Sequence, residues 1–157
     1  MNSAMTYKTT SFAASESMAL GEKLAHLLKG SEVIELSSDL GGGKTTLVKG
    51  LAKGLGYDGE VTSPTFTISR VYSLPNGKEL QHYDFYRLAP DDITAEELAE
   101  AAGEADKIVV IEWAGNVGAK LPDKRMKIQI NATGENTREI TISGQGKYQH
   151  IIEGLKA

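Results

Sequence analysis

Cysteine is absent from the 157-residue sequence, which excludes disulfide bonds, thiolate metal ligands and cysteine nucleophiles at once. Long apolar runs are absent too: the longest, Ile108-Val109-Val110-Ile111, is far shorter than the roughly 20 residues that a membrane-spanning helix needs. The segment Met1–Ser17 lacks the apolar stretch of a signal peptide. These absences predict a soluble, cytoplasmic protein that makes no contact with a membrane.

Excess positive charge is also missing, because 17 Lys and Arg residues against 21 Asp and Glu residues leave a net charge of −4. A free-standing nucleic-acid binder usually carries a basic face and a basic total, so action on RNA would need help from a partner. One mild basic cluster is more typical of a solvated face than of a nucleic-acid site; it consists of Lys120, Lys124, Arg125 and Lys127. Hydrophobic residues at 40% and charged residues at 24% are ordinary for a single globular domain spanning residues 1–157.

Strand-like and helix-like segments alternate along the chain, which is typical of an α/β layered domain. Periodicity predicts helices from Ser15, as a cap, to about Leu28, from Lys44 to near Gly56, from Thr94, also as a cap, to Ala102, and after Gly146. Strands are predicted at 32–37, 68–74, 79–87, 107–113, 125–131 and 138–143, with Asn76-Gly77 as a hairpin turn. We therefore predict a mixed sheet flanked by helices, of the P-loop NTPase type, with an antiparallel C-terminal edge.

A glycine-rich segment joins a predicted strand to a predicted helix, and it reads Asp39-Leu40-Gly41-Gly42-Gly43-Lys44-Thr45-Thr46. Backbone N–H groups at a helix N-terminus bind phosphates, and glycines let the backbone come close to them. Lys44 is placed to reach the β- and γ-phosphates, Thr45 to bind Mg²⁺, and Thr46 to reach the α-phosphate side. The usual phosphate-loop pattern has a further glycine where this chain has Ser38. The alternative is a strand-to-helix turn without a ligand, but the context favours nucleotide binding.

An acidic residue ends the strongly apolar strand predicted at 107–113. Phosphoryl-transfer sites need such a group for the metal ion or for the attacking water, so Glu112 is a candidate metal ligand and catalytic residue. The alternative is a solvated carboxylate at a strand end. Trp113, the only tryptophan, follows it and is either a core residue or a neighbour of the nucleotide.

Polar side chains alternate along the predicted strand at 79–87, where His82, Asp84 and Tyr86 share one face. A carboxylate between two hydrogen-bonding rings suits the positioning of water or support of a metal site. The alternative is the polar face of an edge strand. Upstream, Ser63-Pro64-Thr65 is either a switch loop that senses the γ-phosphate or a plain turn. His26 and His150 have no metal-ligand spacing and are interpreted as structural or surface residues.

Taken together, these motifs resemble the TsaE family, the ATPases of bacterial tRNA threonylcarbamoyladenosine biosynthesis. The resemblance covers about Ser15 to Ser143. It is carried by the segment from Asp39 to Thr46, by Ser63-Pro64-Thr65-Phe66, by His82-Tyr83-Asp84-Phe85-Tyr86-Arg87-Leu88, by Glu112-Trp113 and by Leu121-Pro122. The family usually has glycine at position 38, and the stretch from Asp91 to Asp106 does not follow its usual sequence.

The resemblance implies slow ATP hydrolysis in support of two partner proteins, a threonylcarbamoyl transferase subunit and its inactive paralogue. Their complex modifies the adenosine next to the anticodon of tRNA, which the ATPase would contact only indirectly. By the same resemblance, Lys44 would hold phosphates, Thr45 and Glu112 would hold Mg²⁺, Asp84 would be needed for hydrolysis, and Trp113 would lie beside the nucleotide.

Three other functions are compatible with a phosphate loop. A small P-loop nucleotide or metabolite kinase would cover the phosphates with an arginine-bearing lid, whereas the arginines here are widely separated in sequence: Arg70, Arg87, Arg125 and Arg138. A GTP-driven switch would carry an Asn/Thr-Lys-x-Asp segment, which the sequence lacks. A degenerate loop that binds a partner without turnover is the third alternative.

Overall fold

A computed structural model describes residues 4–38, 43–64, 69–85, 92–112, 122 and 125–157, with the backbone alone for 92–95. The strands are β1 (Met5–Ser11), β2 (Val33–Ser38), β3 (Ser69–Ser73), β4 (Glu79–Asp84), β5 (Lys107–Glu112), β6 (Met126–Ala132) and β7 (Arg138–Gly144). The helices are α1 (Ala14–Ala25), α2 (Lys44–Gly54), α3 (Asp92–Ala101), the 3₁₀ helix η3 (Gly146–Tyr148) and α4 (Gln149–Lys156). Among these described residues, no helix is both long and apolar enough to cross a membrane.

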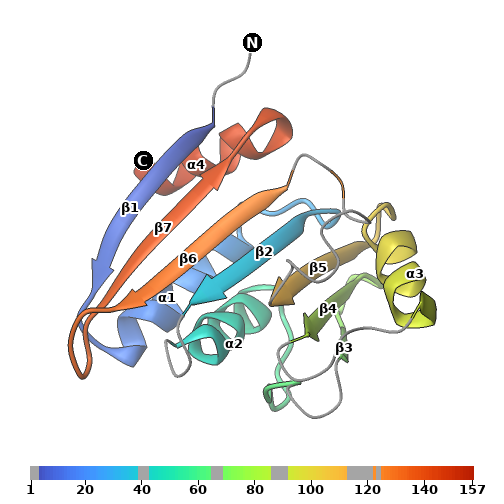
Figure 1. Cartoon of the computed structure of the whole chain (residues 1–157), viewed down its shortest axis with the longest axis horizontal. Helices are drawn as coiled ribbons and strands as arrows, with labels where there is room; N and C mark the ends of the chain where they lie inside the picture. The colour runs from blue at the N-terminus through green and yellow to red at the C-terminus, as the bar shows by residue number, and fades with distance from the viewer. Residues whose placement is uncertain (1–3, 39–42, 65–68, 86–91, 113–121, 123–124) are drawn as a thin grey trace.

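All the strands belong to one seven-stranded sheet with the order β1-β7-β6-β2-β5-β4-β3 (Figure 1). Strand β2 pairs in parallel with β5 and β6, and β5 pairs in parallel with β4. The remaining pairs are antiparallel: β1 with β7, β6 with β7, and β3 with β4. The mixed α/β sheet and its antiparallel C-terminal edge, both predicted from the sequence, are confirmed.

Helices cover both faces of the sheet. The larger core lies on the face that packs against α1, α2 and α4, where Leu24, Leu47 and Ile151 join Ile34 of β2. The smaller core lies on the opposite face, where Leu98 of α3 joins residues such as Val33 and Val109. Neighbouring residues of a strand point to opposite faces, which is why β2 and β5 supply apolar side chains to both cores.

Helices α1 and α2 approach each other closely because glycines line their contact. A Cβ atom added to Gly21 would lie 2.5 Å from the carbonyl oxygen of Leu47, and one added to Gly50 would collide with the backbone of Met18. A Cβ at Gly54 would meet the side chain of Ala25 at 2.6 Å. Backbone sits against backbone here, so the position of α2 on the sheet tolerates no added side chain along this contact.

The hairpin predicted at Asn76-Gly77 is confirmed. The Leu74 amide donates to the Lys78 carbonyl at 2.9 Å, and Gly77 has a φ of 83°, the positive value that favours glycine in such turns. The Lys78 amide also donates to the Asn76 side-chain oxygen at 3.0 Å. Local turn chemistry was therefore sufficient to find the connection between β3 and β4.

Several boundaries differ from the sequence prediction. The cap predicted at Ser15 is wrong, because α1 begins at Ala14 and Ala13 occupies the cap position without a side-chain hydrogen bond. Helix α1 also ends at Ala25 instead of Leu28, since the Leu28 amide turns back to the Ala25 carbonyl at 3.2 Å in a tighter turn. The cap predicted at Thr94 is wrong as well, because α3 begins two residues earlier, at Asp92.

Strand β1 was not predicted. Its residues alternate between half-buried and exposed, but Met5 and Tyr7 are the only large apolar side chains among them. This pattern is too weak to indicate a strand from the sequence. The strand forms because β7 offers its free edge, and the two pair antiparallel from Met5 opposite Gly144 to Ser11 opposite Arg138.

Candidate functional site

Three parallel strands end beside the first turn of α2. The carboxyl ends of β2, β5 and β4 lie at the same edge of the sheet, with Leu36 in register with Glu112 and Glu112 in register with Asp84. Helix α2 starts at Lys44, shortly after β2 ends at Ser38. The carboxyl edge of parallel strands is where α/β sheets bind their ligands, so the topology itself points to this edge.

Glu112 links two basic side chains at this edge. Its Oε1 atom lies 3.4 Å from the Lys44 ammonium, and its Oε2 atom lies 2.5 Å from Nε2 of His82. The carboxylate is buried, with 3% of the residue exposed, and the histidine is fully buried at 0%. A buried carboxylate is stable only with polar partners, and Glu112 has one on each oxygen. The alternative of a solvated strand-end carboxylate is therefore wrong.

Asp84 adds a second buried carboxylate to the same face. It is 5% exposed and pairs in register with Glu112 on the neighbouring strand. Adjacent strands lie about 4.8 Å apart, so the two acidic residues are close neighbours. The Phe85 amide donates to the Glu112 carbonyl at 3.3 Å and continues the pairing beyond Asp84. His82 and Asp84 are two residues apart on β4 and share a face, as predicted, but β4 is not an edge strand, because β3 and β5 flank it.

The first turn of α2 presents backbone donors next to these carboxylates. Gly43 holds the cap position with φ 98° and ψ 18°, and neither a capping side chain nor an acidic residue occupies the first turn. Lys44, Thr45 and Thr46 follow in that turn, all half-buried. Amide groups in the first turn of a helix have no partner within the helix, and the helix dipole adds partial positive charge there. This end of α2 is suited to an anion.

A small cavity of about 80 Å³ opens on the other side of this turn. Three segments line it: the start of α1, the start of α2, and the turn from β6 into β7. The lining residues are Ala13, Ala14, Ser17, Gly43, Thr46, Glu135, Asn136 and Arg138. Ligand pockets usually enclose about 300–1,000 Å³, so this cavity would take only part of a nucleotide.

Arg138 is a site residue that the sequence did not predict. Its Nη1 atom donates to the carbonyls of Gly134, Glu135 and Thr137 at 3.0 to 3.3 Å, which holds the turn between β6 and β7. Its Nε atom would lie 3.7 Å from a Cβ placed on Gly43. Nothing in the spacing of the two residues along the chain signals this contact, which arises because β6 pairs both with β2, the strand before α2, and with β7, which begins at Arg138.

Some predicted site residues lie outside the described residues: Asp39, Leu40, Gly41, Gly42, Thr65, Tyr86 and Trp113. Of the proposed switch loop, Ser63 is exposed and Pro64 is buried. His26 and His150 are exposed, in agreement with their interpretation as surface residues. In the basic cluster, Arg125 donates to Glu35 from both Nε and Nη2, at 3.0 and 2.9 Å, so it serves to join β6 to β2.

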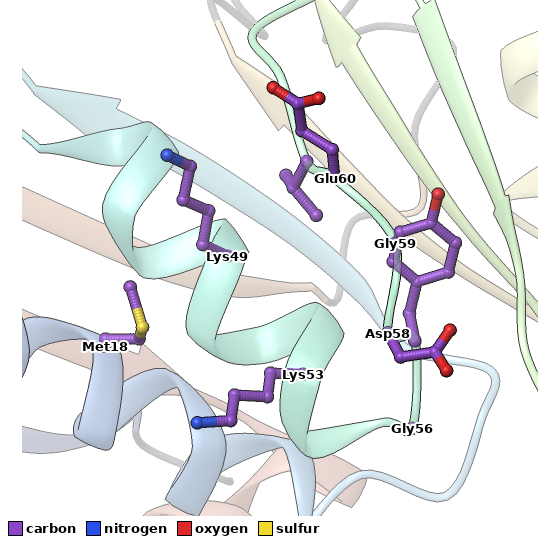
Figure 2. A pocket seen from close by; sticks show the side chains of 9 residues that line it. Met18, Lys49, Lys53, Gly56, Asp58, Gly59 and Glu60 are labelled. Carbon is purple, nitrogen blue, oxygen red and sulfur yellow. The ribbon is translucent and has the colours of Figure 1, made fainter.

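A larger cavity of about 510 Å³ lies elsewhere, along the C-terminal half of α2 (Figure 2). Its walls are Met18, Lys49, Lys53, Gly56, Tyr57, Asp58, Gly59, Glu60 and Val61. Figure 2 shows Lys49 and Lys53 on the helix, with side chains that extend away from the segment that carries Asp58 and Glu60. None of the predicted site residues that the structure describes lines this cavity, so its size does not make it the candidate site.

Two buried tyrosines outside the candidate site have perturbed acidity: Tyr148, and Tyr83, which precedes Asp84 on β4 but belongs to the smaller core. Burial raises the pKa of the Tyr148 hydroxyl, which accepts a hydrogen bond from the Val33 amide at 2.8 Å. Burial, with the nearby carboxylates of Glu97 and Glu79, raises the pKa of Tyr83, whose hydroxyl donates to Gln81 at 2.8 Å. Both hydroxyls therefore stay protonated in the folded protein at neutral pH.

No group of three or more His, Asp or Glu side chains in the described part of the chain forms a ready-made metal cage. Mg²⁺ usually keeps several waters and is held by one or two protein groups together with substrate phosphates. The buried carboxylate of Glu112 and the hydroxyl residue Thr45 at the start of α2 provide oxygen ligands of the right type for such a shared site.

Comparison with known proteins gives consistent matches. Residues 12–140 match the family model described as threonylcarbamoyl adenosine biosynthesis protein TsaE. A tRNA threonylcarbamoyladenosine biosynthesis protein TsaE from Streptomyces coelicolor is 40% identical over 133 residues, which cover 82% of this chain and 90% of the relative. One from Bacillus subtilis is 37% identical over 146 residues, 89% of this chain and 87% of the relative. A crystal structure of Bacillus subtilis YdiB has a TM-score of 0.75 and 31% identity, covering 99% of this chain and 96% of that one.

Proposed function

Because the chain belongs to the TsaE family of tRNA threonylcarbamoyladenosine biosynthesis proteins, we propose that it binds and hydrolyses Mg-ATP in support of that pathway. One observation carries the proposal. Lys44, at the N-terminus of α2, pairs with the buried carboxylate of Glu112, and a second buried carboxylate, Asp84, lies in register with Glu112 at the carboxyl edge of the parallel strands. A phosphate chain and a divalent cation together complement this arrangement of charge, whereas either one alone does not.

The phosphates would lie at the first turn of α2. Backbone amides that follow Gly43 supply hydrogen bonds, and the ammonium of Lys44 supplies a point charge. Lys44 is now paired with Glu112 at 3.4 Å, so binding transfers the lysine from a carboxylate to a phosphate. The loop residues Asp39, Leu40, Gly41 and Gly42 are proposed to complete the cradle, with Trp113 beside the nucleotide.

The residues at the edge fit a magnesium ion. Thr45 and Glu112 would hold it, and when bound the ion neutralises the charge that develops on the phosphates during transfer. Glu112 is already held in place at the sheet edge, because it contacts both His82 and Lys44.

Asp84 would act on the attacking water. Its carboxylate shares a face with His82 and lies in register with Glu112, close to any metal-bound phosphate. A carboxylate there can orient a water molecule and accept its proton as the bond to phosphorus forms. We propose slow hydrolysis by the isolated chain, since partner contacts often complete P-loop sites in trans.

The proposed partners are a threonylcarbamoyl transferase subunit and its inactive paralogue, in the cytoplasm. The net charge of −4 supports a role in which the partners, and not this chain, make the main contacts with tRNA. Pull-down in the presence of ATP, followed by an ATPase assay on the reconstituted mixture, tests this part of the proposal.

A P-loop kinase is the second candidate, and Arg138 is the observation that bears on it. The guanidinium lies next to Gly43 but is bonded to three carbonyls of its own turn, so it is a fixed group and not a mobile lid. Offering ATP with a panel of nucleosides separates the two functions. Transfer of phosphate to a nucleoside would support the kinase, and release of inorganic phosphate alone would support the ATPase.

Calorimetry with ATP provides the direct test of the binding site. Addition of ATP and Mg²⁺ should release heat with the wild type and not with a Lys44→Ala variant. Absence of heat with the wild type would contradict the proposed function.

A further inference from the structure

His82 is a fully buried, ionisable side chain in a core strand, and the proposed mechanism leaves it without a direct part. It is 0% exposed and lies in register with Val110 of β5, on the face that also carries Leu80. The neighbouring positions on this face, Leu80 of β4 and Ile108 and Val110 of β5, hold apolar residues. An apolar side chain of similar volume would fill the same space without the desolvation of a ring nitrogen.

The two nitrogens of the ring are used unequally. Nε2 lies 2.5 Å from Oε2 of Glu112, whereas Nδ1 has no hydrogen-bond partner among the described residues. A carboxylate oxygen can only accept, so Nε2 carries the hydrogen and donates it to Glu112. The hydrogen bond to Glu112 is thus the polar contact that the structure shows for this ring.

That contact divides the Glu112 carboxylate into a fixed and an exchangeable oxygen. His82 holds Oε2, while Oε1 faces the Lys44 ammonium at a longer 3.4 Å. Lys44 is half-buried at the start of α2, whereas His82 is fully buried in the middle of the sheet. When phosphates draw Lys44 away, Oε1 becomes available and Oε2 stays bound to His82.

We infer that His82 is a positioning residue that holds the Glu112 carboxylate so that Oε1 faces the metal ion brought by the nucleotide. The inference rests on the proposed Mg-ATP function and adds to it a residue that orients the metal ligand. A glutamate side chain has three torsion angles that metal binding must fix. A hydrogen-bond donor on one carboxylate oxygen restricts these torsions before the ion binds, which lowers the entropic cost of binding. The expected consequence is a loss of magnesium affinity, not of nucleotide affinity, when the donor is removed.

The test compares two variants of the full chain by titration calorimetry with ATP, once in EDTA and once in Mg²⁺. His82→Leu keeps the volume and removes the donor. His82→Gln places an amide N–H at nearly the reach of Nε2 and restores the donor without the ring. His150→Gln, on an exposed residue, is the matched control. Thermal unfolding of each variant shows whether it is folded.

We expect His82→Leu to leave binding in EDTA unchanged and to reduce the gain in affinity produced by Mg²⁺ roughly tenfold or more. His82→Gln should keep most of that gain. An unchanged gain in His82→Leu, or an equal loss in His82→Gln, would overturn the inference while leaving the proposed function intact. If the wild type binds no ATP in either buffer, the proposed function fails and takes the inference with it. Should His82→Leu not fold, His82→Asn, whose amide is too short to reach Glu112, replaces it in the same comparison.

Discussion

The parallel centre of the sheet, β2, β5 and β4, and its antiparallel flank, β6, β7 and β1, place polar side chains in opposite ways. In the flank, burial alternates along each strand, and β6 sends Lys127 and Gln129 to solvent between buried Met126, Ile128 and Ile130. In the centre, β5 is buried from Ile108 onward on both faces. The exposed polar residues of β6 therefore reach water, whereas the buried Asp84 and Glu112 of the centre must find partners inside the protein.

This difference in burial points to the position of the candidate functional site. The buried charged residues of these strands, Asp84 and Glu112, lie where β4 and β5 end, and there Glu112 meets Lys44 of α2. Burying two carboxylates side by side is unfavourable unless a cation or hydrogen-bond donor compensates them. The protein keeps this unfavourable arrangement at the carboxyl edge of β4 and β5. Substitutions in the centre should therefore affect activity, and similar substitutions in the flank should not.

The largest expected effect on ATP hydrolysis comes from removing the charged groups at the carboxyl edge of the centre, including Lys44 of the adjacent helix α2. Lys44→Ala and Asp84→Ala should each reduce ATP hydrolysis roughly 100-fold or more, because each removes a group that acts on the transferring phosphate or the water. Phosphate release by the reconstituted mixture measures this. Lys49→Ala, on the same helix but exposed, is the matched control and should retain activity. Full hydrolysis by either site variant would remove that residue from the mechanism.

The next largest effect concerns stability and comes from the close packing of α1 against α2, the helix that carries Lys44. Gly50→Ala should lower the free energy of unfolding by about 1–3 kcal/mol, since its Cβ would collide with the Met18 backbone and push α2 from α1. Denaturant unfolding measures the change. Gly103→Ala is the control, because the nearest atom to its added Cβ, the Glu100 carbonyl oxygen, is 3.7 Å away. Equal stability of the two variants would show that the helix pair can separate without penalty.

A comparable effect with a pH signature is expected at Tyr148, where the 3₁₀ helix η3 meets β2. Burial raises its folded pKa above the ordinary value of 10.0, so the unfolded chain ionises first. Stability linked to this hydroxyl is present below pH 10 and is lost as the pH rises above it, with Tyr83 acting in the same direction. Tyr148→Phe should cost about 1–3 kcal/mol at pH 7, because the buried Val33 amide loses its acceptor.

The variant should also lose less of its remaining stability between neutral and alkaline pH than the wild type does. Urea unfolding at a series of pH values checks both statements. An identical alkaline slope in the two proteins would show that Tyr148 titrates alike in the folded and unfolded chains.

The smallest effect is expected in the flank itself. Lys127→Ala and Gln129→Ala change exposed side chains of β6, so each should alter stability by less than about 0.5 kcal/mol and leave hydrolysis unchanged. A marked loss of activity in the reconstituted mixture, with normal activity of the isolated chain, would instead make this face a partner contact. That result would show that the flank also contributes to activity, through contact with a partner.

Local sequence patterns predict the elements that form the site and most of the strands of the sheet. Glycines before Lys44, a strand before them and a helix after them are local features, and so is the turn at Asn76-Gly77. The period-two pattern of β4 placed His82 and Asp84 on one face, which the structure confirms. Each of these follows from neighbours within a few residues, where steric and hydrogen-bonding preferences act without help from the rest of the fold.

The order of the strands in the sheet, in contrast, depends on contacts between distant parts of the chain. Hydrogen bonds between strands join residues far apart in the chain, and periodicity gives a strand its faces but not its neighbours. The pairing of β1 with β7, the approach of Arg138 to Gly43 and the contact of His82 with Glu112 all depend on that order. The sequence supplied the charged groups, and the parallel pairing of β2, β5 and β4 brought them to a single edge.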